Sequence, residues 1–159
     1  LHLSIRRQRQ MCIRDRVIIG EGEERVNLEQ QIDRAGLNSN VYLLGRKGKK
    51  EIGSILCNSD VFVLPSRSET FGVVYVEAMM MGLPVIATVC GGPEEFVQKT
   101  DGLLVPCDDV EALSSAIKDM YENCHQYDHK KISADSRARF SPNVIASQLI
   151  NVFQEVMCK

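Results

Sequence analysis

The sequence has no hydrophobic run long enough to cross a membrane as a helix. Its longest apolar stretch, from Phe71 to Cys90, is interrupted by Glu77 and Pro84 and separates into a helix-length and a strand-length piece. A membrane-spanning helix needs about 20 consecutive apolar residues. We therefore expect no transmembrane segment, and any membrane association to be peripheral.

Paired cysteines are also lacking. The six cysteines form no CxxC pair and no Cys/His cluster with metal-ligand spacing, so they predict neither a zinc site nor a redox motif. Most lie among apolar neighbours, which favours buried free thiols in a reducing cytoplasm. The three histidines occupy polar or terminal positions without an evident partner for base catalysis.

The first sixteen residues differ from the rest of the chain. They carry five arginines, show no helical or strand period that would bury a face, and precede no apolar region of a signal peptide. Residues 11–16 resemble a translated sequencing adaptor. We therefore expect residues 1–16 to be a non-native or disordered leader, with native sequence starting near Val17.

Leaving out this leader changes the charge of the chain. The remainder holds 14 Lys and Arg against 20 Asp and Glu, a net charge of −6 instead of −2. Binding of nucleic acid requires a basic patch or stripe. The acidic balance and the lack of such a stripe exclude nucleic acid as an expected partner.

From Val17 on, short apolar strands alternate with helical patterns, and 159 residues suffice for one domain with its own core. Runs such as Val61–Leu64 and Val85–Ala87 are apolar on both faces, as expected when helices cover both sides of a parallel sheet. The order predicts an α/β fold with a doubly wound, Rossmann-like parallel sheet. Strands are expected at residues 17–19, 41–44, 60–65, 85–87 and 103–105, and helices at about 23–35, 49–57 and 72–81 and from near Pro93.

The last third of the chain is predicted to be helical. Asp108 or Asp109 is expected to cap a helix that runs to about Tyr121. Ser141 and Pro142 are typical of the start of another helix. That helix places five apolar residues on one stripe, namely Ile145, Leu149, Val152, Phe153 and Val156.

The pattern richest in chemistry follows the strand at 61–64. It runs from Ser66 to Met79 and so begins at the carboxyl edge of the sheet, where open α/β folds bind ligands. Gly72 lets the backbone approach a ligand closely. The helix after Gly72 presents N–H groups that suit a diphosphate.

Glu77 lies little more than one turn into this helix, whose neighbouring residues are apolar. Helical side chains lean toward the N-terminus, so the carboxylate reaches back toward the same site. There it would accept hydrogen bonds from a sugar cis-diol, and its apolar surroundings predict a buried charge. The alternative is that Glu77 marks the exposed face of an amphipathic helix.

Glu69 and Glu77, separated by seven residues, match the EX7E motif of retaining glycosyltransferases with the GT-B fold. Between Val17 and about Phe153 the chain resembles the glycogen-synthase-like and mannosyltransferase-like family of these enzymes. Other segments typical of that family are residues 60–66, 77–79, 82–88, 91–95 and 101–106.

This resemblance implies a set of roles. Glu77 would hold the ribose hydroxyls, and Glu69, as the catalytic residue, would lie against the donor sugar as nucleophile or as orienting group. Gly45 and Arg46 would flank the nucleobase. The backbone amides that would contact the sugar and distal phosphate are those of Thr70, Phe71, Gly72 and Val73.

The resemblance also implies the reaction. A UDP-sugar or GDP-sugar would donate its sugar to a glycan, lipid or other acceptor with retention of configuration, without a metal ion or cofactor. The enzyme would work in the cytoplasm or at the inner membrane surface. Residues 17–159 would be the donor-binding domain. The family's N-terminal acceptor domain and its cationic Gly-Arg…Lys segment are not visible, so this chain is expected to be inactive by itself.

Two other classes of function share some of these features. A non-catalytic nucleotide-sugar-binding module would share the same residues. A dinucleotide-dependent oxidoreductase is disfavoured because residues 20–24 contain three glutamates and lack the third glycine of the phosphate-binding fingerprint, which favours an ordinary turn. The basic cluster at 46–50 is interpreted as a solvated loop, whereas Gly91 and Gly92 suit either a structural turn or the shaping of a cleft.

Overall fold

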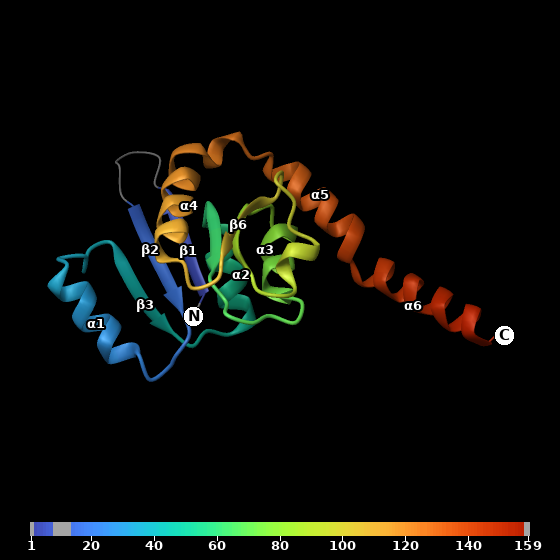
Figure 1. The fold of residues 1–159 in the computed structure, drawn as a ribbon, viewed down its shortest axis with the longest axis horizontal. Helices are drawn as coiled ribbons and strands as arrows, with labels where there is room; N and C mark the ends of the chain where they lie inside the picture. Colours follow the sequence, from blue (N-terminus) through green and yellow to red (C-terminus); the bar gives the residue numbers. More distant parts are fainter. Residues whose placement is uncertain (1, 8–13, 158–159) are drawn as a thin grey trace.

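The computed structural model describes residues 2–7 and 14–157, and within them one six-stranded sheet is flanked by helices (Figure 1). The strands lie in the order β3-β2-β1-β4-β5-β6. Their bounds are β1 (His2–Arg7), β2 (Arg14–Ile19), β3 (Val41–Gly45), β4 (Val61–Leu64), β5 (Val85–Val89) and β6 (Gly102–Pro106).

All strands except β1 run in the same direction. The pairs β2–β3, β4–β5 and β5–β6 are parallel, and β1 is antiparallel to both of its neighbours, β2 and β4. The carboxyl ends of five strands therefore meet at one edge of the sheet. Ligands of open α/β sheets bind at this edge.

Helices and the sheet's alternating side chains divide the core into two layers. On one face, Phe62, Leu64 and Val85 pack with residues of α2, α3 and α5. On the other, Val61, Val63 and Ile86 pack with α4. The helices are α1 (Arg25–Arg34), α2 (Lys49–Cys57), α3 (Val73–Met80), α4 (Val110–Asn123), α5 (His129–Phe140) and α6 (Pro142–Met157), with short 3-10 turns η1 (Pro93–Glu95) and η2 (Cys124–Gln126).

This arrangement confirms the predicted Rossmann-like α/β fold. The strand Val61–Leu64 is buried on both faces, as its unbroken apolar run predicted. The helix expected at 49–57 coincides with α2, and Asp109 caps α4 through a 2.8 Å hydrogen bond from the amide of Ala112.

Strand β1 was not predicted. No burial period indicated a strand before Val17, yet His2–Arg7 lies between β2 and β4, and β2 starts at Arg14. Pairing with strands on both sides supplies backbone hydrogen bonds that do not depend on the side-chain pattern. That residues 1–16 are non-native, and that the domain comprises residues 17–159, stays a prediction.

Two further expectations are corrected. The helix expected from Pro93 is only the single turn η1. Of the described cysteines, which are free thiols, Cys124 is buried but Cys57 is exposed, so burial is not their common feature.

Helix α6 projects from the rest of the molecule (Figure 1). Its predicted apolar stripe is exposed, from 39% at Ile145 to 67% at Val156. None of the described helices combines the length and the apolar character needed to span a membrane.

Candidate functional site

The loop between β4 and α3 crosses the carboxyl edge of the sheet. It ends at Gly72, which has φ 92° and immediately precedes the first residue of α3, Val73. A Cβ at Gly72 would stand 2.6 Å from Cδ2 of Tyr75, so the position has neither the backbone conformation nor the space for a side chain. The predicted helix therefore begins directly after Gly72, and no side chain caps its N-terminus.

A second loop, after β5, supports the first. The amide of Gly92 donates to the carbonyl oxygen of Glu69 at 2.8 Å, and the amide of Glu69 donates to that of Cys90 at 3.4 Å. A Cβ at Gly92 would stand 2.6 Å from the Cα of Phe71. Gly92 is thus glycine because the backbone of the first loop lies directly against it.

Aromatic packing fixes the same loop from another side. The Phe71 ring lies 5.1 Å from that of Phe96 and 5.9 Å from that of Phe140, and the latter two are 5.7 Å apart. Aromatic pairs at such separations add about 0.5–1.5 kcal/mol each beyond their buried area. The loop is therefore tied to η1 and to the end of α5.

Two buried hydroxyl groups hold the end of β4. Tyr75, which is fully buried, donates its hydroxyl to the carbonyl oxygen of Leu64, and Thr88 donates to that of Ser66. Burial raises the pKa of the Tyr75 phenol, so the hydroxyl keeps its proton and remains a donor across the physiological range.

Replacing Tyr75 with phenylalanine is expected to lower the free energy of unfolding by about 1–3 kcal/mol, because the Leu64 carbonyl loses its side-chain partner in a buried setting. Urea denaturation measures this change. Tyr42→Phe is the matched control, since the Tyr42 hydroxyl donates to the Ser39 carbonyl on the surface. A Tyr75 variant as stable as the Tyr42 variant would contradict the assignment.

Glu77 is exposed, and the prediction of a buried charge was wrong. Positions 73, 77 and 81 lie four residues apart and share one side of the helix; Val73 is 61% exposed and Met81 42%. The opposite side of α3, with Tyr75 and Met79, enters the core. Helix α3 is apolar nearly all round, but the rest of the described structure packs against only one side of it and leaves the side with Glu77 exposed.

Gly45 and Arg46 lie at the same edge, beyond strands β2 and β1. Gly45 is buried with φ 70°, it accepts a 3.0 Å hydrogen bond from the amide of Gly20, and Arg46 is exposed. Adjacent strands are about 4.8 Å apart, so β3 and β4 are separated by roughly 14 Å. The structure thus does not bring Gly45 next to Glu69; an elongated ligand would be needed to touch both.

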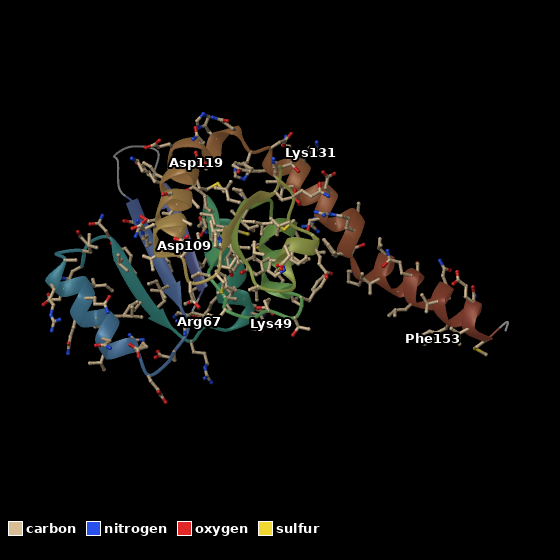
Figure 2. All side chains as sticks on the ribbon, viewed as in Figure 1. Lys49, Arg67, Asp109, Asp119, Lys131 and Phe153 are labelled. Carbon is tan, nitrogen blue, oxygen red and sulfur yellow. The ribbon has the colours of Figure 1, made fainter. Side chains whose placement is uncertain are left out.

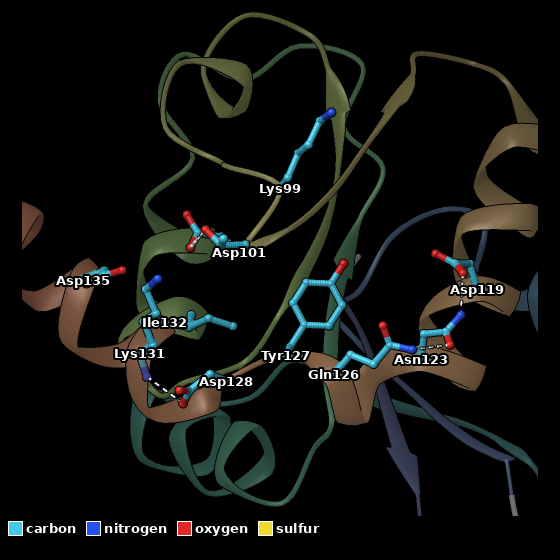
Figure 3. A pocket seen from close by; sticks show the side chains of 11 residues that line it. Lys99, Asp101, Asp119, Asn123, Gln126, Tyr127, Asp128, Lys131, Ile132 and Asp135 are labelled. Carbon is cyan, nitrogen blue, oxygen red and sulfur yellow. Dashed lines mark hydrogen bonds between the residues drawn. The ribbon is translucent and has the colours of Figure 1, made fainter.

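One cavity of the described residues lies away from this edge. About 510 Å³ in volume, it is formed by η2, the start of α5 and the loop before β6, and it was not predicted (Figure 3). Figure 2 shows Asp119 and Lys131, two of its lining residues, at the far end of the sheet from Arg67, which follows β4. Its lining includes two lysines and four aspartates, Asp101, Asp119, Asp128 and Asp135, an excess of negative charge that disfavours a diphosphate.

A smaller cavity of about 380 Å³ adjoins the carboxyl edge on the α4 side. It is lined by Thr88, Pro106 and Leu113, and an exposed ion pair of Arg67 and Asp108, 2.7 Å apart, stands at it. Sequence reasoning missed this pair because its members are 41 positions apart. The positive φ of Asp108, 56°, is a backbone feature without a distinctive sequence signal.

Comparison with known proteins gives consistent matches. The model of the family "Glycosyl transferases group 1" matches residues 14–145. A D-inositol 3-phosphate glycosyltransferase of Corynebacterium urealyticum is 31% identical over 86% of this chain and 33% of its own length. A putative colanic acid biosynthesis glycosyltransferase of Salmonella typhimurium is 32% identical over 98% of this chain and 42% of its own.

Solved structures agree with these sequences. HepE of Anabaena in complex with UDP superposes with a TM-score of 0.76 at 28% identity, over 87% of this chain and 40% of HepE. The sucrose-phosphate synthase of Thermosynechococcus elongatus has a TM-score of 0.75 at 26% identity, over 89% and 38%. The chain therefore spans less than half the length of each of these four proteins.

Proposed function

The chain belongs to the glycosyl transferases group 1 family, and we propose that it binds a nucleoside-diphosphate sugar at the carboxyl edge of its sheet, as the donor-binding part of a sugar-transferring enzyme. One observation carries the proposal: the loop from Glu69 to Gly72 is anchored from several sides and leads directly into the N-terminus of α3. A helix N-terminus without a side-chain cap favours a phosphate group.

The proposed roles follow the ligand along the edge. The amides from Thr70 to Val73 would bind the sugar and distal phosphate, and Glu69 would act on the donor sugar. Glu77, exposed one turn into α3, would accept hydrogen bonds from the ribose. Gly45 and Arg46 would flank the base; the roughly 14 Å between β3 and β4 suits a ligand as extended as a nucleotide sugar.

The reaction proposed is transfer with retention of anomeric configuration and without a metal ion. Retention would follow in either of two ways. Glu69 would orient and stabilise the donor sugar while the acceptor attacks the anomeric carbon from the side on which the nucleoside diphosphate leaves. Alternatively, Glu69 would displace the nucleoside diphosphate from the opposite side, and the acceptor would then displace Glu69. HepE has been crystallised with UDP-glucose, and this supports a UDP-sugar as the donor of the present chain. The acceptor would be a glycan or a lipid-linked sugar.

A thermal-shift screen of the chain with UDP, GDP and their glucose and mannose conjugates tests donor binding. One nucleotide series is expected to stabilise the chain, by about 2.7 kcal/mol when the ligand is present at a hundred times its dissociation constant. Adenosine at equal concentration is the control, because it lacks the diphosphate. No stabilisation by any diphosphate at millimolar concentration would count against the proposal.

A further inference from the structure

Glu94 accepts hydrogen bonds from two backbone amides close to the proposed donor site. It belongs to η1, behind the Glu69 loop, and its two carboxylate oxygens turn back toward the end of β5. Oε1 accepts the amide of Gly91 at 2.9 Å, and Oε2 accepts that of Cys90 at 3.2 Å. One side chain thereby closes the turn between β5 and η1.

That turn carries the donor loop. Gly91 forms an isolated parallel β-bridge with Glu69, and the neighbouring carbonyl of Cys90 and amide of Gly92 bond the Glu69 backbone on both sides. Hydrogen bonds therefore connect the Glu94 side chain to the Cys90–Gly92 turn, and that turn to the backbone of Glu69. Gly91 itself has φ 129°, a backbone conformation that residues with a side chain rarely adopt.

We propose that Glu94 is a positioning residue for donor binding: its carboxylate fixes the Cys90–Gly92 turn, and through it the backbone of Glu69 and the phosphate-facing amides that follow. The inference rests on the proposed function. Glu94 itself touches no donor atom; it acts by holding another loop in place.

The charge of Glu94 suits this role. Hydrogen bonds from its own backbone amide, and then from those of Gly91 and Cys90, lower the pKa of the carboxyl, so it is ionised at neutral pH. Bonds from amides to an ionised acceptor are stronger than bonds between neutral groups. By occupying these two amides, Glu94 also withholds them from the diphosphate and leaves the amides after Glu69 as the phosphate site.

Glu94→Ala removes both hydrogen bonds, whereas Glu94→Gln keeps one acceptor oxygen. Glu122→Ala, on the exposed side of α4, is the control for loss of one negative charge.

In the ligand-free chain, hydrogen exchange of the Gly92 amide, which is bonded to Glu69, is expected to accelerate at least about tenfold in Glu94→Ala and less in Glu94→Gln. The exchange of core amides in β4 should not change.

Calorimetry with UDP and with GDP then tests the consequence. The nucleotide that binds the unaltered chain is expected to bind Glu94→Ala about tenfold more weakly, with partial recovery in Glu94→Gln and no change in Glu122→Ala. Unchanged Gly92 exchange, or unchanged affinity, in a folded Glu94→Ala variant would overturn the positioning role. If Glu94→Ala does not fold, the Gly92 exchange rate and the nucleotide affinity of Glu94→Gln test the positioning role, and the role is overturned if either is unchanged.

The two proposals fail in different ways. If the unaltered chain binds neither nucleotide, the donor-binding function fails, while the exchange of the Gly92 amide still reports whether Glu94 holds the turn. If the unaltered chain binds and Glu94→Ala binds equally well, only the positioning role is lost.

Discussion

Replacing Glu77 with alanine is expected to weaken the binding of the matching nucleoside diphosphate by about tenfold or more, since hydrogen bonds to a charged acceptor contribute about 1.5–3 kcal/mol each. The exposed position of Glu77 on α3 allows a ribose to approach from solvent. Isothermal calorimetry on the folded variant measures the change.

A pair of ligands makes this test specific. The unaltered chain is expected to prefer UDP over 2′-deoxy-UDP, or GDP over its deoxy form, because Glu77 would accept from the 2′-hydroxyl. Glu77→Ala should lose that preference, and Glu77→Gln should keep part of it. Tighter binding by Glu77→Ala would contradict the assignment, because it would mean that the carboxylate faces the phosphates and repels them.

The second large effect concerns stability. Arg139→Ala is expected to lower the free energy of unfolding by about 3 kcal/mol, because it leaves the buried carboxylate of Asp101 without its cationic partner. Asp101 is only 2% exposed, and its Oδ2 lies 3.0 Å from a guanidinium nitrogen of Arg139. Arg139 also donates to the carbonyl of Phe96 at 2.9 Å, so the variant loses a link between α5 and η1.

Urea denaturation of three variants tests this ion pair. Arg137→Ala is the control, since Arg137 is exposed and its guanidinium donates to two neutral oxygens, those of Ser133 and Met80. The double variant Asp101→Asn, Arg139→Ala should recover part of the loss, because no unpaired charge remains. A change below about 1 kcal/mol in Arg139→Ala would show that the buried carboxylate does not need its partner.

Local patterns predicted the elements that depend on local physics. The apolar run Val61–Leu64 predicted a doubly covered strand because burial on both faces leaves no polar period. Gly72 was predicted to precede a helix, and the structure places it directly before α3 in a conformation that glycine adopts readily. The helix predicted at about 49–57 coincides with α2.

Features set by distant partners were not predictable in this way. Strand β1 is placed by pairing with β2 and β4, and Arg139 finds Asp101 across 38 positions. Glu77 was predicted to be buried from its apolar neighbours, but Val73 and Met81 share its exposed side. An apolar neighbourhood in sequence does not say which side of a helix the rest of the fold covers.

The same distinction applies to the candidate site. Glu69 and Gly72 were found from spacing in one segment, whereas their support comes from the turn after β5 and from the ring of Phe140. The contacts of Glu94 with the Cys90 and Gly91 amides are local, but their connection to Glu69 needs the sheet to place β4 beside β5.

Amide chemical shifts followed during titration with UDP-glucose or GDP-mannose show which residues the donor contacts. The largest changes are expected at residues 69–73, with a second group at Gly45 and Arg46. Shifts concentrated around the cavity near Asp119 and Lys131, with the amides after Glu69 unchanged, would contradict donor binding at the carboxyl edge of the sheet.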